Sequence, residues 1–358
     1  MNKKIKTWII LTPGFPKDED DTTCLPFLQQ FVREMDHQFP GLRIVILAFD
    51  YPFKTEAFQW HRHEVIPFNG WKKSKPQKAL KWLRVWRTMK KIKRNSELAG
   101  VLSLWCTECA LLGNRFAKRN GLLHFCWIQG QDAKKQNKYV RWIKPRVSEL
   151  IAISNFLQTE FEKNHDIRPG HVIPVGINPE EFPVQDLERE IDILGVGSLI
   201  QLKQYELFVE SVYELRKSYP GIKAMLCGKG TEAGHLQRLI EKYELQNSIM
   251  LTGELPHEEV LRLMKRSRVF LHPSNYEGLG VVCIEALYAG CHVISFVQPI
   301  HYDIEQWHIV QTKEAFTGLA AAILQNPSTQ YRSVLTFTAR ESVEKIMQLY
   351  HYSESVIS

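Results

Sequence analysis

Residues 272–294 combine two carboxylates with several glycines, a pattern that is able to bind both a sugar and a phosphate. Glu277 lies in a loop after an apolar run that ends at Ser274, and Glu285 lies in the helix expected to begin near Gly280. Backbone N–H groups at a helix start favour an anion, and glycines let a ligand approach them closely. The two acids can accept hydrogen bonds from hydroxyls. The segment therefore favours a sugar joined to a diphosphate, while a solvated turn and an exposed helix face explain the acids equally well.

The elements around this segment predict α/β domains. Between residues 191 and 296, short apolar runs alternate with helical segments of about 10–15 residues, which indicates parallel βαβ units. The first half follows the same plan less regularly. Expected strands are 7–12, 43–49, 100–104, 123–128, 149–153, 191–197, 222–227, 248–252, 269–272 and 292–296, and the main expected helices are 24–36, 78–93, 107–119, 155–163, 204–218 and 281–288.

The length of 358 residues indicates two domains, and the Pro- and Glu-rich segment 179–188 is the expected connector. We expect residues 1–176 to form an N-terminal acceptor-side domain and residues 177–335 to form a C-terminal nucleotide-sugar-binding domain. Residues 336–358 would form a helix that packs back on the N-terminal domain. Because ligands bind at the carboxyl ends of strands in such sheets, the site is expected in a cleft between the domains.

Composition excludes disordered and collagen-like chains, since 44% of the residues are hydrophobic and 11% are aromatic. The formal net charge is +7, yet residues 1–180 carry 30 Lys and Arg against 17 Asp and Glu, whereas residues 181–358 carry 16 against 22. The seven scattered cysteines are typical of a reducing compartment and of buried thiols, and the spacing around Cys106 and Cys109 fits no ordinary zinc site. The apolar run that ends at Pro13 is too short for an export signal. The two halves of the chain are expected to do different jobs.

The segment from Pro273 to Gly290 resembles the E-x7-E signature of glycosyltransferase family 4, the retaining GT-B enzymes. Flanking segments resemble further motifs of that family, so that the likeness covers roughly residues 149–295. These segments are 151–154, the connector 173–182, 195–203, 226–230 and 251–255. The resemblance implies an α/β GT-B fold, with two Rossmann-like, doubly wound parallel-sheet domains facing a cleft. It also implies a metal-independent hexosyltransferase without a cofactor, which moves a sugar from a UDP- or GDP-linked donor to a glycan or lipid-linked acceptor in polysaccharide biosynthesis.

The resemblance also implies roles for single residues. Glu277 would bind the donor sugar near the reacting carbon, and Glu285 would hold the ribose. Lys203 would neutralise the leaving diphosphate, whose charge grows in the transition state. Leu255 would lie against the base. The remaining donor-binding positions implied are Gly14, Gly197, Ser198, Gly228, Gly278, Leu279 and Gly280.

The sequence departs from the family pattern at several positions. Ser198 stands where the family usually has Arg, and Gln129 stands where it often has His. The loop after Phe296 lacks the usual glycine-rich pattern. Gln cannot act as a base, but in the front-face mechanism proposed for the family the departing phosphate takes the acceptor proton, so an orienting amide suffices. Gln129 and Asp132 therefore remain candidate catalytic residues, with strand-end capping as the alternative.

These departures leave two rival functions open. A GT-B nucleotide-sugar epimerase would keep the fold and the donor site. A catalytically weak glycan- or membrane-binding protein would explain Ser198 and Gln129.

Residues 72–94 contain eleven cations and no acid. The pattern predicts a basic amphipathic helix whose apolar stripe is Leu80, Trp82, Leu83, Val85, Trp86, Met89 and Ile92, with Lys81, Arg84, Lys91 and Arg94 opposite. Such a helix is typical of a peripheral contact with an anionic membrane, here on the cytoplasmic, inner face. The alternative is a helix that packs on its sheet and exposes a solvated basic face. Nucleic acid is disfavoured because no recognised nucleic-acid module is present.

Overall fold

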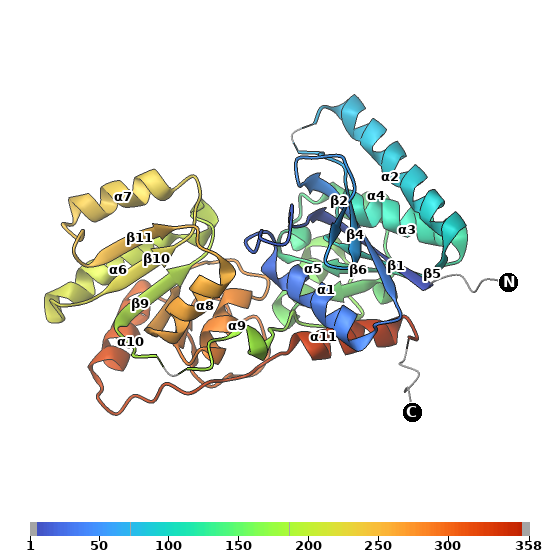
Figure 1. Cartoon of the computed structure of the whole chain (residues 1–358). Coiled ribbons are helices and arrows are strands. Elements are labelled where there is room, and N and C mark those ends of the chain that lie inside the picture. Colours follow the sequence, from blue (N-terminus) through green and yellow to red (C-terminus); the bar gives the residue numbers. More distant parts are fainter. Residues whose placement is uncertain (1–5, 72, 186, 353–358) are drawn as a thin grey trace, which may run out of the picture. The chain divides into compact units, whose positions relative to one another are not determined.

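The computed structural model describes residues 6–71, 73–185 and 187–352 (Figure 1). The chain divides into two compact units. The first unit comprises Met1–Val175 together with Ala339–Ser358, and the second comprises Gly176–Thr338. Each unit is a sheet of mainly parallel strands with helices on both faces, which confirms the predicted α/β class.

The second unit is built on a six-stranded parallel sheet in the order β11-β10-β9-β12-β13-β14. The strands are β9 (Ile191–Val196), β10 (Ala224–Cys227), β11 (Ile249–Gly253), β12 (Ser267–His272), β13 (His292–Ser295) and β14 (Trp307–Ile309). From β9 the chain moves outward through β10 and β11, then returns to β12 on the other side of β9. The carboxyl ends of β9 and β12 therefore form a topological switch point, where open α/β sheets bind ligands.

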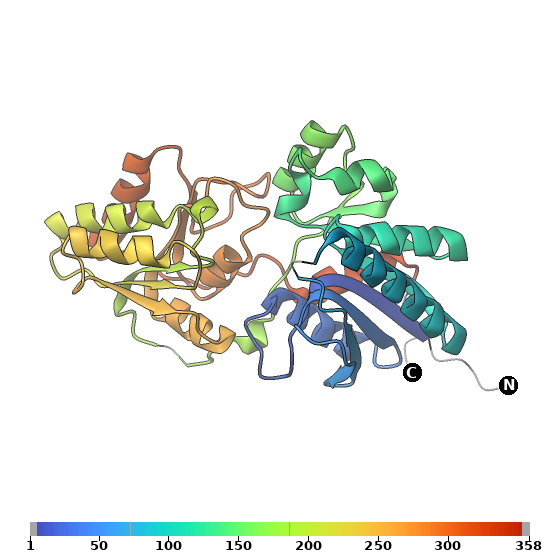
Figure 2. The same ribbon diagram turned by 90° about the horizontal axis from the view of Figure 1, so that it is seen from above.

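Helices cover both faces of this sheet. One face carries α6 (Tyr205–Ser218), α7 (Ala233–Lys242) and α10 (Lys313–Gln325), which share a buried core with the strands (Figures 1 and 2). α8 (His257–Lys265) and α9 (Val281–Tyr288) pack against each other and against β9, β12 and β13. The start of α8 follows β11, and the start of α9 follows β12. Both helix starts therefore lie at the carboxyl edge of the sheet.

The first unit has an eight-stranded sheet in the order β3-β4-β2-β1-β5-β6-β7-β8, parallel except for the β3–β4 hairpin. The strands are β1 (Lys6–Gly14), β2 (Arg43–Tyr51), β3 (Phe58–Trp60), β4 (His63–Pro67), β5 (Glu97–Leu104), β6 (His124–Ile128), β7 (Leu150–Ala152) and β8 (His171–Val172). The helices are α1 (Pro26–Gln38), α2 (Lys75–Asn95), α3 (Glu108–Asn120), α4 (Lys138–Ile143), α5 (Asn155–His165) and α11 (Ala339–Leu349). Here β1 and β5 form the switch point.

The C-terminal helix α11 belongs to the first unit and packs beside α1. Just after it, the Tyr350 ring meets Trp8 edge-on at 5.2 Å and Phe125 at 5.0 Å between centroids. The Tyr350 hydroxyl donates a hydrogen bond of 2.6 Å to the carbonyl of Val101. Tyr350 thus ties the end of the chain to three strands of the first sheet.

Helix α2 begins with a capping box in which the Ser74 amide donates to Gln77 Oε1 at 2.9 Å. The predicted apolar stripe is divided in the structure. Val85, Met89 and Ile92 pack into the core of the first unit, whereas the Leu80 and Leu83 side chains are exposed, at 59% and 44%. Lys72, the first residue of the predicted basic segment, lies outside the described residues.

The prediction that Lys81 lies on the basic, solvated face of this helix is wrong. Lys81 is buried, and its Nζ donates to Glu108 Oε1 at 2.6 Å and to Asp50 Oδ1 at 2.9 Å. Helical periodicity cannot reveal this, because the two acids come from α3 and β2, 27 and 31 residues away. In the parts of the chain that the structure describes, no helix has the length and apolar character needed to cross a membrane.

Most expected elements lie within a few residues of their predicted bounds, and the exceptions are short or atypical. The elements not expected from the sequence are β3, β4, α4, β14 and α10. The β3–β4 hairpin has strands of three and five residues, so alternation has little room to show. The strand expected over 269–272 ends at His272, although the apolar run continues to Ser274. Pro273 and Ser274 therefore lie in the loop that leads to Glu277.

Replacing Tyr350 by Ala should lower the free energy of unfolding of the first unit by about 3 kcal/mol or more, because a buried aromatic ring and its hydrogen bond are lost. Urea denaturation followed by tryptophan fluorescence measures this, since eight of the nine tryptophans lie in residues 1–175. The exposed neighbour Gln348, changed to Ala, should shift the same free energy by less than about 0.5 kcal/mol. Equal effects of the two changes would contradict the anchoring role of Tyr350.

Candidate functional site

Glu277 follows β12 and is held by two basic side chains. Lys203 Nζ, from the turn after β9, donates to Glu277 Oε2, and His272 Nε2 lies 3.0 Å from the same oxygen. Burial alone would raise the pKa of Glu277, but His272 and Lys203 outweigh it and hold that pKa at about 2. Glu277 is therefore a carboxylate at neutral pH. The structure brings the two predicted residues Glu277 and Lys203 into direct contact.

His272 is a site residue that the sequence analysis missed. It is the last residue of β12, it is buried, and burial lowers the pKa of its imidazole. A neutral ring whose Nε2 carries the proton can donate to Glu277. Within the described chain, its Nδ1 has no hydrogen-bond partner. The available signal was a histidine at the end of an apolar strand, one position before Pro273.

Glu285 lies in α9 and is 4% exposed, so the interpretation of an exposed helix face is wrong for this residue. Its Oε1 lies 2.8 Å from Nε2 of His257, the first residue of α8. His257 Nδ1 lies 3.5 Å from Glu181 Oε2, in the turn Pro179–Glu181. Although burial opposes it, Glu285 and Glu181 raise the pKa of His257 to about 10. A charged imidazole therefore joins the two carboxylates, and sequence spacing gave no sign of it.

The glycines at the ends of β9 and β10 adopt backbone conformations that other residues rarely take. Gly197 has a φ of 153° and Gly228 a φ of 146°. A Cβ on Gly228 would lie 1.9 Å from the Gly197 carbonyl oxygen, and one on Gly230 would lie 2.1 Å from that of Leu199. These strand ends are therefore closely packed turns. A side chain at Gly228 or Gly230 would clash with these carbonyl oxygens, so both turns require glycine.

The other predicted donor-binding residues of this unit lie at the same edge of the sheet. Ser198 is exposed directly after Gly197, and Leu255 is partly buried after β11. Gly278 and Leu279 are buried between Glu277 and the start of α9, where Gly280 takes a left-handed φ of 71° as the N-cap. The carboxyl ends of β9 to β12 thus gather the acids, Lys203 and the glycine turns.

Gly14, Gln129 and Asp132 lie in the first unit, at the carboxyl ends of β1 and β6. Asp132 is 2% exposed, and its Oδ2 accepts a hydrogen bond of 2.8 Å from the Gln129 amide. Burial raises the pKa of Asp132 to about 7. Gln129 is also buried, and its Nε2 lies 3.5 Å from the Trp127 carbonyl. These contacts are those of strand-end capping, the alternative given for both residues.

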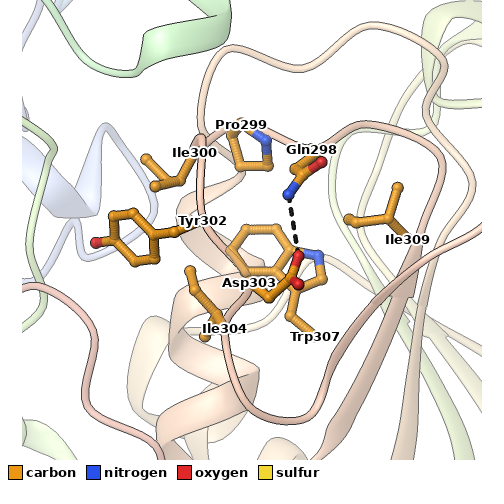
Figure 3. A pocket seen from close by; sticks show the side chains of 8 residues that line it. All are labelled: Gln298, Pro299, Ile300, Tyr302, Asp303, Ile304, Trp307 and Ile309. Carbon is orange, nitrogen blue, oxygen red and sulfur yellow. Dashed lines mark hydrogen bonds between the residues drawn. The ribbon is translucent and has the colours of Figure 1, made fainter.

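The loop after β13 differs from the other strand ends of this unit. Figure 3 shows Pro299, Ile300, Ile304 and Trp307 around a small pocket, with Gln298 Nε2 directed to Asp303 Oδ1 at 3.3 Å. Trp307 Nε1 donates to Ser295 Oγ at 3.0 Å, which fixes the indole beneath the loop. The loop is closed by its own side chains and is not held by glycine turns.

Comparison with known families matches residues 178–332 to the model described as glycosyl transferases group 1. That range contains both acids of the site, Lys203, His257 and His272. The matched range makes up most of the second unit, and we refer to this unit as the group 1 domain because of that match. This match confirms the predicted relationship to glycosyltransferases at the level of the group 1 family.

Curated relatives of the group 1 domain are similar over part of their length. The phosphatidylinositol N-acetylglucosaminyltransferase gpi3 subunit of Schizosaccharomyces pombe is 26% identical over 214 residues, 57% of this chain and 47% of that protein. Glycogen synthase of Mycobacterium tuberculosis is 26% identical over 179 residues, 48% of this chain and 43% of that protein. In both comparisons, the match covers less than half of the relative.

Solved structures resemble almost the whole chain. Sucrose-phosphate synthase from Thermosynechococcus elongatus has a TM-score of 0.66 and 16% identity, covering 96% of this chain and 95% of that one. Anabaena Alr3699/HepE in complex with UDP-glucose has a TM-score of 0.67 and 14% identity, with the same coverage. At these identities the likeness shows the fold alone, and the predicted GT-B fold is confirmed.

The His257 bridge should make the stability of the group 1 domain depend on pH. Because the pKa of His257 rises from about 6.5 unfolded to about 10 folded, its contribution is complete below pH 6.5 and is lost as pH rises through 10. The substitution His257→Gln should lower the free energy of unfolding at pH 6 by about 2–4 kcal/mol. The deficit should shrink toward pH 10.5. Thermal and urea unfolding at pH 6, 8 and 10.5 measure it, and a deficit independent of pH would contradict the charged bridge.

Proposed function

We propose that this chain is a retaining, metal-independent glycosyltransferase that moves a sugar from a nucleotide-sugar donor to a glycan or lipid-linked acceptor. The observation that carries the proposal is the paired arrangement of Lys203 with Glu277 and of His257 with Glu285 at one switch point of a group 1 domain. One pair suits a diphosphate and a sugar, and the other suits a ribose. Closely packed glycine turns follow β9 and β10 at the same edge of the sheet.

The ion pair of Lys203 and Glu277 supports a specific sequence of events. Without a donor, the two side chains neutralise each other. A donor diphosphate attracts Lys203, and a sugar hydroxyl takes its place on Glu277. His272 stays on Glu277 Oε2 and keeps the carboxylate in position. As the diphosphate leaves, Lys203 stabilises its growing negative charge. The neutral Ser198 would stabilise that charge less.

The names of the relatives support a broad acceptor class. The S. pombe relative is named for transfer of N-acetylglucosamine to phosphatidylinositol, and the M. tuberculosis relative for synthesis of glycogen. The pneumococcal O-GlcNAc transferase GtfA, with a TM-score of 0.58 and 17% identity, was solved with UDP and GlcNAc. We therefore keep both a glycan and a lipid-linked acceptor, selected by the first unit, and a UDP- or GDP-linked donor.

A second function, a catalytically weak glycan- or membrane-binding protein, is favoured by two observations. Ser198 supplies no cation beside the glycine turn, and Gln129 is buried in a capping contact. A nucleotide-sugar epimerase remains the third candidate, distinguished by a new sugar nucleotide formed without an acceptor. Turnover of donor distinguishes transfer from the binding-only function.

Glu277→Gln should reduce transfer and donor hydrolysis by at least about 100-fold, because a neutral amide cannot pair with Lys203 or hold the sugar hydroxyl as strongly. The measurement is release of nucleoside diphosphate from a panel of UDP- and GDP-sugars, chosen by thermal shift. Glu214→Gln is the matched control, since Glu214 pairs with Lys217 on an exposed surface. If the wild-type chain neither binds nor hydrolyses any donor of the panel, the proposed function is wrong. A chelator should leave the rate unchanged.

We also propose that α2 carries the peripheral contact with an anionic membrane on its inner face. The exposed Leu80 and Leu83 side chains lie among exposed cations, while the buried Lys81 takes no part. Each cation close to an anionic surface contributes about 1 kcal/mol of attraction. The exposed cations on the helix are Lys75, Lys78, Arg84, Arg87, Lys90, Lys91, Lys93 and Arg94.

Replacing Arg84, Arg87, Lys90 and Lys91 by Glu should release the chain from vesicles that contain phosphatidylserine, in a sedimentation assay at low salt. The control replaces the same number of exposed cations in the second unit: Lys223, Arg238, Lys242 and Lys313. That control should keep most of the binding. If both variants bind the vesicles equally well, α2 does not contact the membrane and its cations form only a solvated basic face.

A further inference from the structure

We propose that His257 is a positioning residue that holds one oxygen of Glu285, so that the other oxygen accepts the hydroxyls of the donor ribose. The inference rests on the proposed function and deepens it, because it assigns the ribose-selecting geometry to a residue outside the E-x7-E segment. The contact that carries it is the 2.8 Å hydrogen bond from His257 Nε2 to Glu285 Oε1. Only one carboxylate oxygen is used in this contact.

The second partner of His257 fixes the direction of its ring. Glu181 Oε2 lies 3.5 Å from Nδ1, so the two ring nitrogens face two different carboxylates. An imidazole that donates from both nitrogens carries a positive charge. This charge balances Glu285 before any ligand arrives, so the neutral hydroxyls of a ribose can bind without having to offset the charge of the acid. The Glu285 side chain is almost fully buried, and the paired imidazole offsets the cost of burying it.

The three residues come from three separate elements of the second unit. His257 begins α8, Glu285 lies in α9, and Glu181 ends the turn Pro179–Glu181. That turn is itself fixed by Asn178, whose side chain accepts a hydrogen bond of 3.1 Å from the Glu180 amide. The bridge therefore connects the beginning of the unit to its donor site.

The position of His257 along the chain also ties two parts of the nucleoside site together. Leu255, the residue expected to lie against the base, is two residues before His257. His257 thus joins the base-facing turn after β11 to the acid of α9. Lys203, His272 and Glu277 form a separate cluster for the diphosphate and sugar. The donor site divides into two halves, each with its own neutralised carboxylate.

A residue that merely stabilises the domain would act differently from one that positions Glu285. Loss of a general stabiliser weakens every ligand alike. Loss of the positioning contact weakens only ligands that have ribose hydroxyls. The decisive quantity is therefore the ratio of dissociation constants for a 2′,3′-dideoxynucleoside diphosphate and for its ribose parent.

The experiment is isothermal titration calorimetry, which measures the dissociation constants of the full chain for two ligands. These ligands are UDP or GDP, whichever binds the wild type, and the matching 2′,3′-dideoxy compound. For the wild type we expect the ribose compound to bind at least about tenfold more tightly, as hydrogen bonds to a carboxylate imply. In His257→Leu this ratio should fall to about one. In His257→Gln, which keeps a donor and folds more readily, it should fall by about threefold. The control His235→Leu removes an exposed histidine that pairs with Glu206 and should leave the ratio unchanged.

Each other outcome overturns a specific statement. If either His257 variant keeps the wild-type ratio, His257 does not position Glu285, whatever happens to stability. If the wild type binds both compounds equally, Glu285 does not hold the ribose and the inference fails, while donor binding stands. If the wild type binds no nucleoside diphosphate at all, the proposed function itself fails.

Discussion

The site depends on placing two carboxylates, Glu285 buried and Glu277 partly buried, at one edge of a parallel sheet without leaving their charges unbalanced. A buried carboxylate is costly unless it is paired and hydrogen-bonded. The charge of Glu277 is balanced by Lys203, and His272 donates a hydrogen bond to it. Glu285 is balanced by His257, which Glu181 holds from the other side. These residues come from different strands and turns, so the sheet topology must be correct before either acid can be buried. The fold of the second unit and its chemistry therefore rest on the same few contacts.

The two pairs differ in what a ligand must do to them. Lys203 and Glu277 contact each other directly, so under the proposed function a donor would have to separate them before they could serve its diphosphate and its sugar. The bridge at His257 uses one oxygen of Glu285, so under the inference above a ribose would bind the other oxygen without breaking the bridge. One half of the site thus exchanges partners while the other keeps its geometry. Such preorganisation lowers the cost of ordering the site when a ligand binds.

Much of the fold was visible in the sequence, because alternating apolar runs and helical periods are local signals. Helices α6 and α9 and strands β9 and β12 lie close to their expected bounds. Strands of three to five residues, such as β3 and β4, lacked enough residues for a period to be detected. The candidate site was equally readable where it is a linear motif, from Glu277 to Glu285. His272 and His257 were not identified from the sequence, because neither lies at a spacing that belongs to a motif. For α2 the prediction was wrong at Lys81, because helical periodicity placed this residue on the solvated face.

The sequence alone determined which residue types line the strand ends, the order of the longer elements other than α10, and the split in charge between the halves. These features depend on neighbours within about ten positions and on composition. Only the tertiary structure decided which of the charged residues are paired and which are free to meet a ligand. Lys81 meets Glu108 and Asp50, and His257 meets Glu181, through contacts that join distant segments. The physical reason is that the energy of a charge depends on burial and on the partners that the fold brings to it.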